Sequence, residues 1–196
     1  MSGLNISKKQ LIAGAVVPLA VLASGGLVWQ SSYSAFSATT ASPTNNWTAG
    51  TVALADDDTN TALFSTGANN LKPGSTGNKC IVVTSSGSLA STVKLYATSY
   101  TQTKALGDSL NVKVEEGTGG TFASCTGFTA GSTVFDGTAT AFGAKTDFAS
   151  GVGTWAPAAG TVTKTYKVTY TLSATTPDTA QGGTAAVGFT WESQNS

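Results

Sequence analysis

The sequence predicts an all-β protein, a jelly-roll-like antiparallel β-sandwich that follows a cleaved signal peptide. Threonine, serine and glycine are frequent, and only 10% of the residues are charged, which suits strands joined by tight turns. Several segments alternate apolar and polar side chains with a period of two, as half-buried strands do. After residue 36 no segment has the longer period of a helix. We therefore expect roughly eight to ten strands with the spacing of a sandwich or jelly roll.

Residues 1–34 are predicted to be the signal peptide. Lys8-Lys9 precede an apolar run at 11–28, and small residues follow it, in the order that export signals use. The run approaches the length of a membrane span, so a retained N-terminal anchor is the alternative. We favour cleavage because Pro18 and Gly25-Gly26 weaken a continuous helix.

The predicted cleavage site lies between Ser34 and Ala35, where Ser32 and Ser34 supply the small residues that a signal peptidase needs. A cut after Ala35 is the alternative. Either cut predicts a protein that is secreted, extracellular or at the cell surface, with no stable membrane span after processing. The expected parts are the signal at 1–34, a flexible or strand-donating segment at 35–47 and the jelly-roll-like β domain at 48–196.

The chain without its signal has neither arginine nor histidine, and eight lysines oppose ten acidic residues. A basic patch that grips phosphates is therefore not expected, and nucleic acid is not an expected partner. The lack of histidine removes the Ser-His-Asp and Cys-His mechanisms and the common zinc motifs. We expect no enzyme activity, no catalytic residues and no cofactor.

The expected strands follow one another along the β domain, and turn-forming residues separate them. The acidic run at 56–58 ends the first strand, and Pro73-Gly74 fits the centre of a type II turn. Gly119-Gly120 turns the chain again. The glycine- and alanine-rich stretch at 137–161 predicts no element, and three aromatic side chains are expected to tether it: Phe142, Phe148 and Trp155. The strands are expected at 47–54, from 62, and at 80–83, 93–98, 110–115, 134–135, 162–172 and 185–191.

Cys80 and Cys125 are an even pair in a chain that is expected to be exported, so we predict a disulfide between them. Closing the loop between them would stabilise the fold by roughly 4 kcal/mol in the chain-entropy model. Two free thiols are the alternative if the surroundings are reducing.

The adjacent acidic residues Asp56, Asp57 and Asp58 are the chain's one acidic cluster. Carboxylate oxygens are the ligands that calcium prefers, so a calcium site is one hypothesis. The alternative is a polar turn whose carboxylates bind nearby backbone N–H groups. We favour the turn because no calcium-binding spacing surrounds the cluster. Glu115 and Glu116 are neighbours in an expected strand, so their carboxylates point to opposite faces and cannot share a substrate.

Several short segments follow one another along the chain in a recognisable order: Ser32–Phe36, Trp47–Leu54, Asn70–Gly74, Gly87–Leu89 and Phe189–Glu192. Together they resemble the TasA/camelysin family of exported proteins. The resemblance covers the signal, roughly residues 35–97 and the C-terminus, and the stretch at about 100–160 does not match.

The resemblance implies export through the dedicated signal peptidase SipW and a jelly-roll subunit of a biofilm-matrix fibre. It also implies that the segment from Ala35 to about Trp47 leaves its own subunit and adds a strand to the next one, with Phe36 and Trp47 as anchors. Such a head-to-tail contact does not close on itself, so it propagates into a homopolymer. The pair Cys80–Cys125 and the less charged middle of the chain differ from TasA itself.

Two other functions are weighed against the fibre subunit. One is a monomeric surface adhesin or glycan-binding module, in which Trp47, Trp155 and Trp191 would line a groove, although packing in the core is the commoner fate of tryptophan. The other is a metallopeptidase, because camelysin is described as one in that family. We do not expect peptidase activity, because this sequence offers no histidine ligand.

Overall fold

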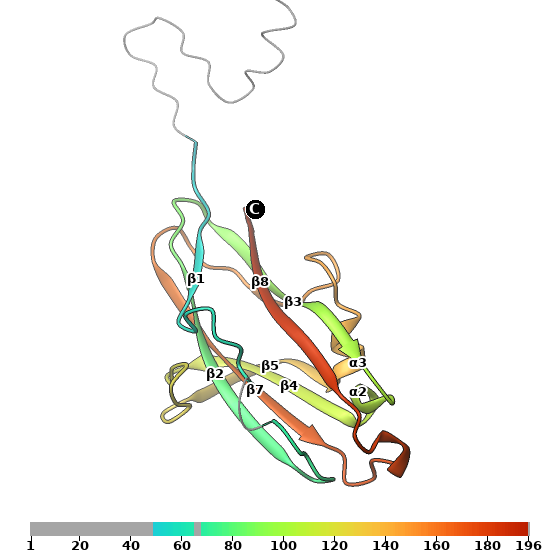
Figure 1. Ribbon diagram of the computed structural model, residues 1–196. Coiled ribbons are helices and arrows are strands. Elements are labelled where there is room, and N and C mark those ends of the chain that lie inside the picture. The colour runs from blue at the N-terminus through green and yellow to red at the C-terminus, as the bar shows by residue number, and fades with distance from the viewer. Residues whose placement is uncertain (1–48, 65–67, 196) are drawn as a thin grey trace, which may run out of the picture. The chain divides into compact units, whose positions relative to one another are not determined.

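Two antiparallel sheets face each other in this protein (Figure 1). The computed structural model describes residues 49–64 and 68–195, and Gly50–Ser196 forms one compact unit. The larger sheet has the strand order β1-β2-β7-β4-β5, and the smaller sheet has the order β6-β3-β8. The strands are β1 (Leu54–Asp56), β2 (Thr76–Ser85), β3 (Ser91–Gln102), β4 (Leu110–Thr118), β5 (Thr129–Thr138), β6 (Val152–Trp155), β7 (Val162–Leu172) and β8 (Ala185–Asn195). The predicted all-β antiparallel class is confirmed, and the jelly-roll connectivity stays a prediction.

The predicted signal peptide at 1–34 lies outside the described residues. The same holds for its cleavage site at Ser34 and Ala35, and for the segment 35–47 with its two expected anchors, Phe36 and Trp47. Within the described part of the chain, no helix is long and apolar enough to cross a bilayer.

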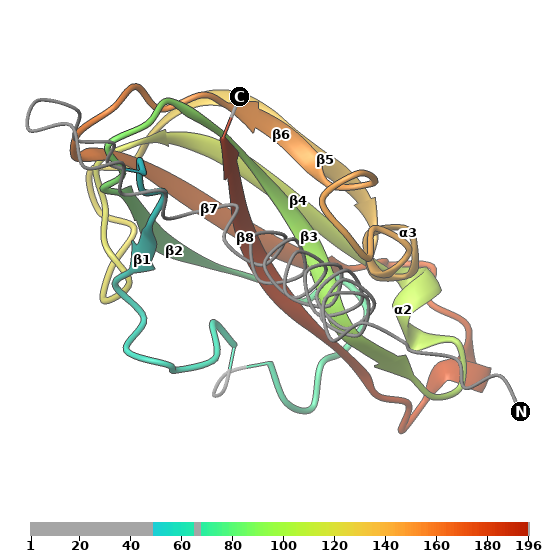
Figure 2. The ribbon, with the colours of Figure 1, turned by 90° about the horizontal axis from the view of Figure 1, so that it is seen from above.

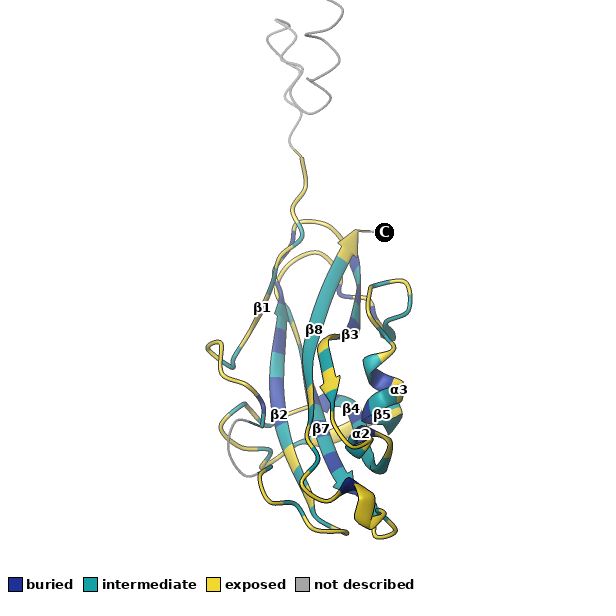
Figure 3. Cartoon of the chain, turned by 45° about the vertical axis from the view of Figure 1, so that its right-hand side comes forward, coloured by how far each residue is buried: buried dark blue, intermediate teal, exposed yellow. Residues whose placement is uncertain are grey.

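Alternating side chains build the core from both sheets, as the sequence predicts. Strand β7 has the predicted bounds, and its Val168 is fully buried. From the opposite sheet, Val93, Leu95 and Ala97 of β3 face inward. Buried residues of β2 and β4 complete one continuous core (Figure 3), so the two sheets form a sandwich.

One side of the sandwich is closed by β5, β6 and two short helices. These are α2 (Leu106–Ser109) and α3 (Ala139–Gly143), which lie together at one end in Figure 2. Thr138 caps α3 by accepting a hydrogen bond from the N–H of Ala141 at 3.1 Å. The stretch 137–161 thus holds a helix and a strand that the sequence does not predict. Of the three aromatic side chains expected to tether this stretch, Phe142 and Trp155 are buried, as predicted. Phe148 is only half-buried, and Lys94 Nζ lies 5.0 Å from the centre of its ring.

Three expected strands differ in the structure. Residues 49–53 form no strand, because the segment beside them is the loop that follows β2 and not a strand: the carbonyl group of Ala53 accepts from Ser86 and that of Thr51 from Ser88, at 3.0 and 2.9 Å. The strand expected from residue 62 is also absent, and Leu63 is buried there in an irregular segment. Strand β5 is longer than expected, because its exposed first half carries small polar residues that show no alternation.

The predicted turns are confirmed by backbone geometry. Gly74 has a φ of 85°, and the N–H of Ser75 donates to the carbonyl of Lys72 at 2.9 Å, which is the geometry of a type II turn. Gly119 and Gly120 have φ of 76° and 72°, which glycine adopts without strain.

The connection from β4 to β5, residues 119–128, reaches across the larger sheet to the far edge of β2, where Figure 1 shows it beyond that strand. We call it the strap. Its Phe128 lies under Lys167 of β7 at 5.7 Å, and its Cys125 bonds to Cys80 of β2. Its Phe122 N–H donates to Asp57 at 2.8 Å. The strap therefore ties β7 and β2 to the chain that follows β1.

Candidate functional site: the open groove beside strand β8

Strand β8 is an edge of the smaller sheet, and its neighbour β3 lies on one side only. Within β3, the N–H groups of Ser91 and Ala97 donate to Pro157 and Lys145, away from β8. Backbone groups of successive residues point to opposite sides of an antiparallel strand. From Ser91 to Thr98, before the register shift, strand β3 therefore uses its even-numbered residues to bond to β8.

The register then shows which groups of β8 are free. From Gly188 to Asn195, even-numbered residues of β8 lie opposite even-numbered residues of β3, as Glu192 does opposite Lys94. They bond to β3, so the N–H and C=O groups of the odd-numbered residues point away from it. Beyond the register shift, where Ala186 lies opposite Thr101, the hydrogen bond from Thr103 N–H to the Thr184 carbonyl shows that even-numbered residues on the β8 side still bond toward β3. Within the described ranges, no hydrogen bond reaches the outward groups, which belong to Val187, Phe189, Trp191 and Ser193.

The side chains of these same residues point into the sandwich. Trp191 lies opposite Leu95, which faces the core, and its ring packs against Tyr166 at 5.3 Å. Phe189 stacks on Phe142 with ring centroids 5.1 Å apart. The unpaired backbone of β8 and its apolar side chains therefore border the same space.

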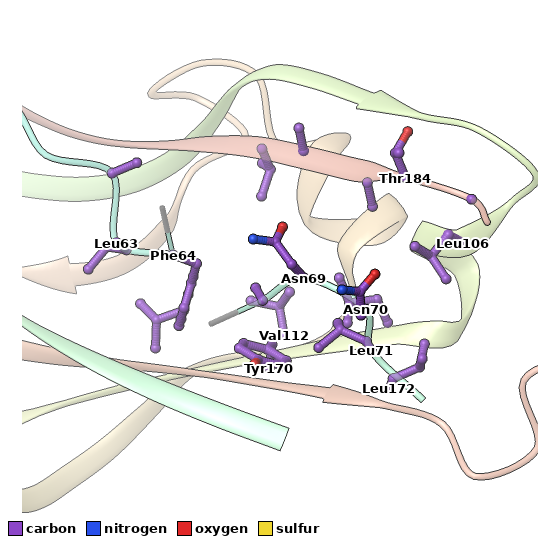
Figure 4. Close-up of a pocket in the computed structure, with 18 of the residues that line it drawn as sticks. Leu63, Phe64, Asn69, Asn70, Leu71, Leu106, Val112, Tyr170, Leu172 and Thr184 are labelled. Carbon is purple, nitrogen blue, oxygen red and sulfur yellow. The ribbon is translucent and has the colours of Figure 1, made fainter. Parts of the chain in front are cut away.

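That space is an open groove of about 1500 Å³ between the two sheets. The larger sheet contributes Val112, Tyr170 and Leu172 to its lining, and β8 contributes residues 185–189 and Trp191. In Figure 4, Tyr170 and Leu172 lie across the open space from Thr184, the residue that precedes β8. The groove thus follows the free edge of β8.

Residues 58–73 line the groove opposite β8, with 65–67 outside the described residues. Leu63 is 8% exposed and belongs to the core. Phe64 meets Tyr170 edge to face at 5.1 Å. In Figure 4, Leu63 and Phe64 lie at one end of the open space, and Asn69, Asn70 and Leu71 line it further along.

The lining of the groove carries little charge. Asp58, Lys72 and Asp178 are its charged residues among those described. Burying a charged group without a partner is costly. The groove therefore suits an uncharged occupant that has its own backbone groups to pair with β8.

The other sheet edges offer less to a partner. Strands β1 and β6 have three and four residues, and β5 pairs with β4 through two register shifts. Short strands and bulges are the usual protection of an edge. Strand β8 has 11 residues and a regular register from Gly188 to Asn195, so among the described strands it is the long regular edge.

The acidic cluster is held by hydrogen bonds. Asp57 Oδ1 accepts from the N–H of Val82 at 2.8 Å, and Asp57 Oδ2 accepts from Phe122 N–H at 2.8 Å. Asp56 and Asp58 each accept a backbone N–H two residues further on. These contacts support the polar-turn interpretation of Asp56, Asp57 and Asp58. Among the described residues, no three histidine, cysteine, aspartate or glutamate side chains gather in a way that could hold a metal ion.

The pKa of Asp56 is raised above its ordinary value. Partial burial is the main cause, and a side-chain hydrogen bond with Asp58 and the nearby charges of Asp57 and Asp58 add to it.

The disulfide between Cys80 and Cys125 is present, with Cα atoms 5.3 Å apart. Cys80 is fully buried. It lies opposite Lys167 in the register, whereas its neighbour Ile81 faces the core. The disulfide therefore fastens the strap to the outer face of the larger sheet, away from the groove.

Two other candidate groups do not converge on a site. Glu115 pairs with Lys113 at 2.8 Å, and Glu116 accepts from Ser132 at 2.9 Å, so the two carboxylates have separate partners. Trp155 is 7% exposed and packs in the core, which does not suit a glycan-binding surface. Trp191 borders the groove, and Trp47 lies outside the described residues.

The groove itself is not predicted by the sequence analysis. The alternation of Val187, Phe189 and Trp191 predicts a strand with one apolar face, but it does not say that the strand is an edge. Edge position depends on strand order, which long-range pairing decides. The available signal was the lack of charge from 185 to 191 in a long strand, because most edges carry protective charges.

A comparison of the chain with models of protein families gives no match, and a comparison with curated proteins gives none either.

Proposed function

We propose that this protein is a secreted structural protein, a subunit of an extracellular fibre in a biofilm matrix or at the cell surface. Subunits join head to tail when residues 35–47 of one copy add a strand to the sandwich of the next copy. The proposal combines the resemblance to the TasA/camelysin family with the open groove beside β8. The groove is the observation that carries it.

Strand addition needs a free edge, and β8 supplies one. Main-chain hydrogen bonds to an exposed edge give affinity, and pockets for alternate side chains give specificity. The outward backbone groups of Val187, Phe189, Trp191 and Ser193 are the unpaired edge, and the groove lies beside the first three of these residues. A long unprotected edge strand can pair with a strand of another chain. Such pairing leads to aggregation of a monomeric protein, but it is the contact that a fibre subunit needs.

The segment 35–47 matches the groove in chemistry. It contains no charged side chain, and it holds Phe36, several alanines and hydroxyl residues. Such a strand loses little by entering an apolar groove, because its backbone groups find partners on β8 and it brings no charge to desolvate.

Deleting residues 35–46 from the secreted chain tests this proposal. We expect filaments of the wild type by negative-stain electron microscopy and only monomers of the deletion variant. Replacing 35–46 by an equal length of glycine and serine is the control for chain length, and it should also stay monomeric. If the wild type stays monomeric at every concentration, or the deletion variant polymerises equally well, the proposal is wrong.

The two alternatives gain no support from the described residues. A glycan-binding surface uses exposed aromatic rings, yet Leu89 is the one large hydrophobic residue described as well exposed. A peptidase needs a cluster of ligands or catalytic side chains, and the acidic residues instead have structural partners. We therefore keep the fibre subunit as the single proposal.

A further inference from the structure

The proposed assembly leaves open which side chains of the donated strand enter the groove and in which direction the strand runs. We infer that residues 35–42 of a second copy pair antiparallel with β8, an inference that rests on the proposed function. This pairing places Phe36, Ala38 and Thr40 in the groove. Ser37 and Thr39 then face away from it, and Trp47 is not a groove anchor.

Strand parity selects the face. Alternate residues of a strand share a face, so Phe36 and Ala38 lie on one face and Ser37 and Thr39 on the other. The first face carries the one large apolar side chain of residues 35–46. The apolar side chains in the lining of the groove, among them Val112, Leu172 and Phe189, favour that face.

Proline sets the end of the donated strand. Pro43 has no N–H and cannot continue a paired strand. The strand that remains, 35–42, is about 26 Å long at about 3.3 Å per residue. The part of β8 from Val187 to Ser193, which offers outward groups, is about 23 Å long by the same measure. Trp47 lies beyond Pro43 and eleven positions after Phe36. Because eleven is an odd number, an unbroken strand would place Trp47 and Phe36 on opposite faces.

The attachment point of the segment indicates a second copy. Thr51 bonds to Ser88 in the loop before β3, and the first residue of β3, Ser91, lies opposite Asn195. The segment therefore enters the domain at the end of the sandwich where β8 finishes. If it folded back on its own groove directly, it would run parallel to β8, whereas every pairing between described strands is antiparallel.

An antiparallel strand from the same copy would need a return path. Residues 43–49 would have to run back along the whole donated strand, at no more than about 3.6 Å per residue. That reach, about 25 Å, equals the distance to be covered and leaves no residue for the turn. A second copy meets no such limit.

Two neighbouring substitutions test the face. Ala38→Asp puts a charge into the groove and should raise the critical concentration for filaments on the order of 100-fold or more. Ser37→Asp puts the same charge on the outer face and should change it by no more than about threefold. Equal effects of the two variants would overturn the assigned face while the proposed function, judged by the deletion of 35–46, would still stand.

A mixing experiment tests the second copy. Val187→Pro removes an edge N–H that has no partner in the described structure, so it should spare the fold and block the acceptor; Val187→Asp is the second variant if the proline lowers the melting temperature. Because Val187 packs against the core, Ser193→Pro, at another outward N–H, is the variant to use if both Val187 substitutions lower the melting temperature. Mixed with Ala38→Asp chains, a folded acceptor variant should give a dimer that cannot grow, detected by native mass spectrometry. If wild-type chains polymerise but the mixture gives no dimer, the assignment to β8 is wrong.

Discussion

At the scale of single residues, Asp57 joins three parts of the chain through one carboxylate. It follows β1, and its two oxygens accept from Val82 on the edge of β2 and from Phe122 in the strap. Hydrogen bonds to a charged acceptor are stronger than neutral ones. This carboxylate also stands at the start of residues 58–73, which line the groove. It therefore fixes where that lining begins.

Replacing Asp57 by alanine should lower the free energy of unfolding by roughly 2–4 kcal/mol, because two backbone donors lose a charged acceptor. Asp58→Ala is the matched control, since the side-chain bonds of Asp58 to Asn60 and Asp56 stay within one exposed turn, and it should cost about 0.5–1 kcal/mol. Urea denaturation followed by tryptophan fluorescence measures both. Equal losses for the two variants would show that the bridge to the strap contributes nothing.

At the scale of elements, the strap depends on its disulfide. Residues 119–128 carry two large apolar side chains, of which Phe122 packs against the core, and Cys125 attaches them to the fully buried Cys80. Phe122 and Phe128 add contacts with Lys79 and Lys167 at 5.4 and 5.7 Å. Such exposed cation–π contacts are worth only about 0.5–1 kcal/mol each, so the covalent bond is the main constraint.

The double variant Cys80→Ala with Cys125→Ala should lose roughly 4 kcal/mol of stability, because the unfolded chain regains the freedom of a loop that spans a sequence separation of 45. The wild type under reducing conditions should unfold at the same urea concentration as the double variant. A midpoint that does not move in either case would mean that the strap is held by its other contacts.

The elements also show what the sequence can predict. Strand β7 and the inward face of β3 follow from alternation alone, and the Pro73-Gly74 turn follows from the φ values that these residues prefer. The prediction of a strand from residue 62 is wrong. A short apolar run indicates burial but not the type of element, and Leu63 is buried in an irregular segment that pairs with no strand. Helix α3 was missed, although Thr138 is a typical helix cap.

The candidate site was harder to predict than the elements. The sequence marks Val187, Phe189 and Trp191 as one face of a strand, yet the groove exists because β8 has a neighbour on one side only. Asp57 is likewise recognisable as a turn residue, but its partners are 25 and 65 positions away. Contacts of that range come from the packing of the whole chain, which periodicity does not encode.

At the scale of the whole molecule, the sandwich is closed on one side and open on the other. Strands β5 and β6 with α2 and α3 close the first side, and the second side keeps the groove of about 1500 Å³ along β8. A soluble monomer normally protects a long edge. The fibre proposal accounts for this asymmetry, because the strand that completes the smaller sheet comes from another subunit.

Amide hydrogen exchange along β8 tests this account most directly. In unpolymerised chains that lack residues 35–46, the N–H groups of Val187, Phe189, Trp191 and Ser193 should exchange fast, while even-numbered neighbours that bond to β3 are protected. In wild-type filaments these four amides should become protected as well, because the donated strand bonds to them. If filaments form and the four amides still exchange as fast as in the monomer, subunits do not join along β8 and the account is contradicted.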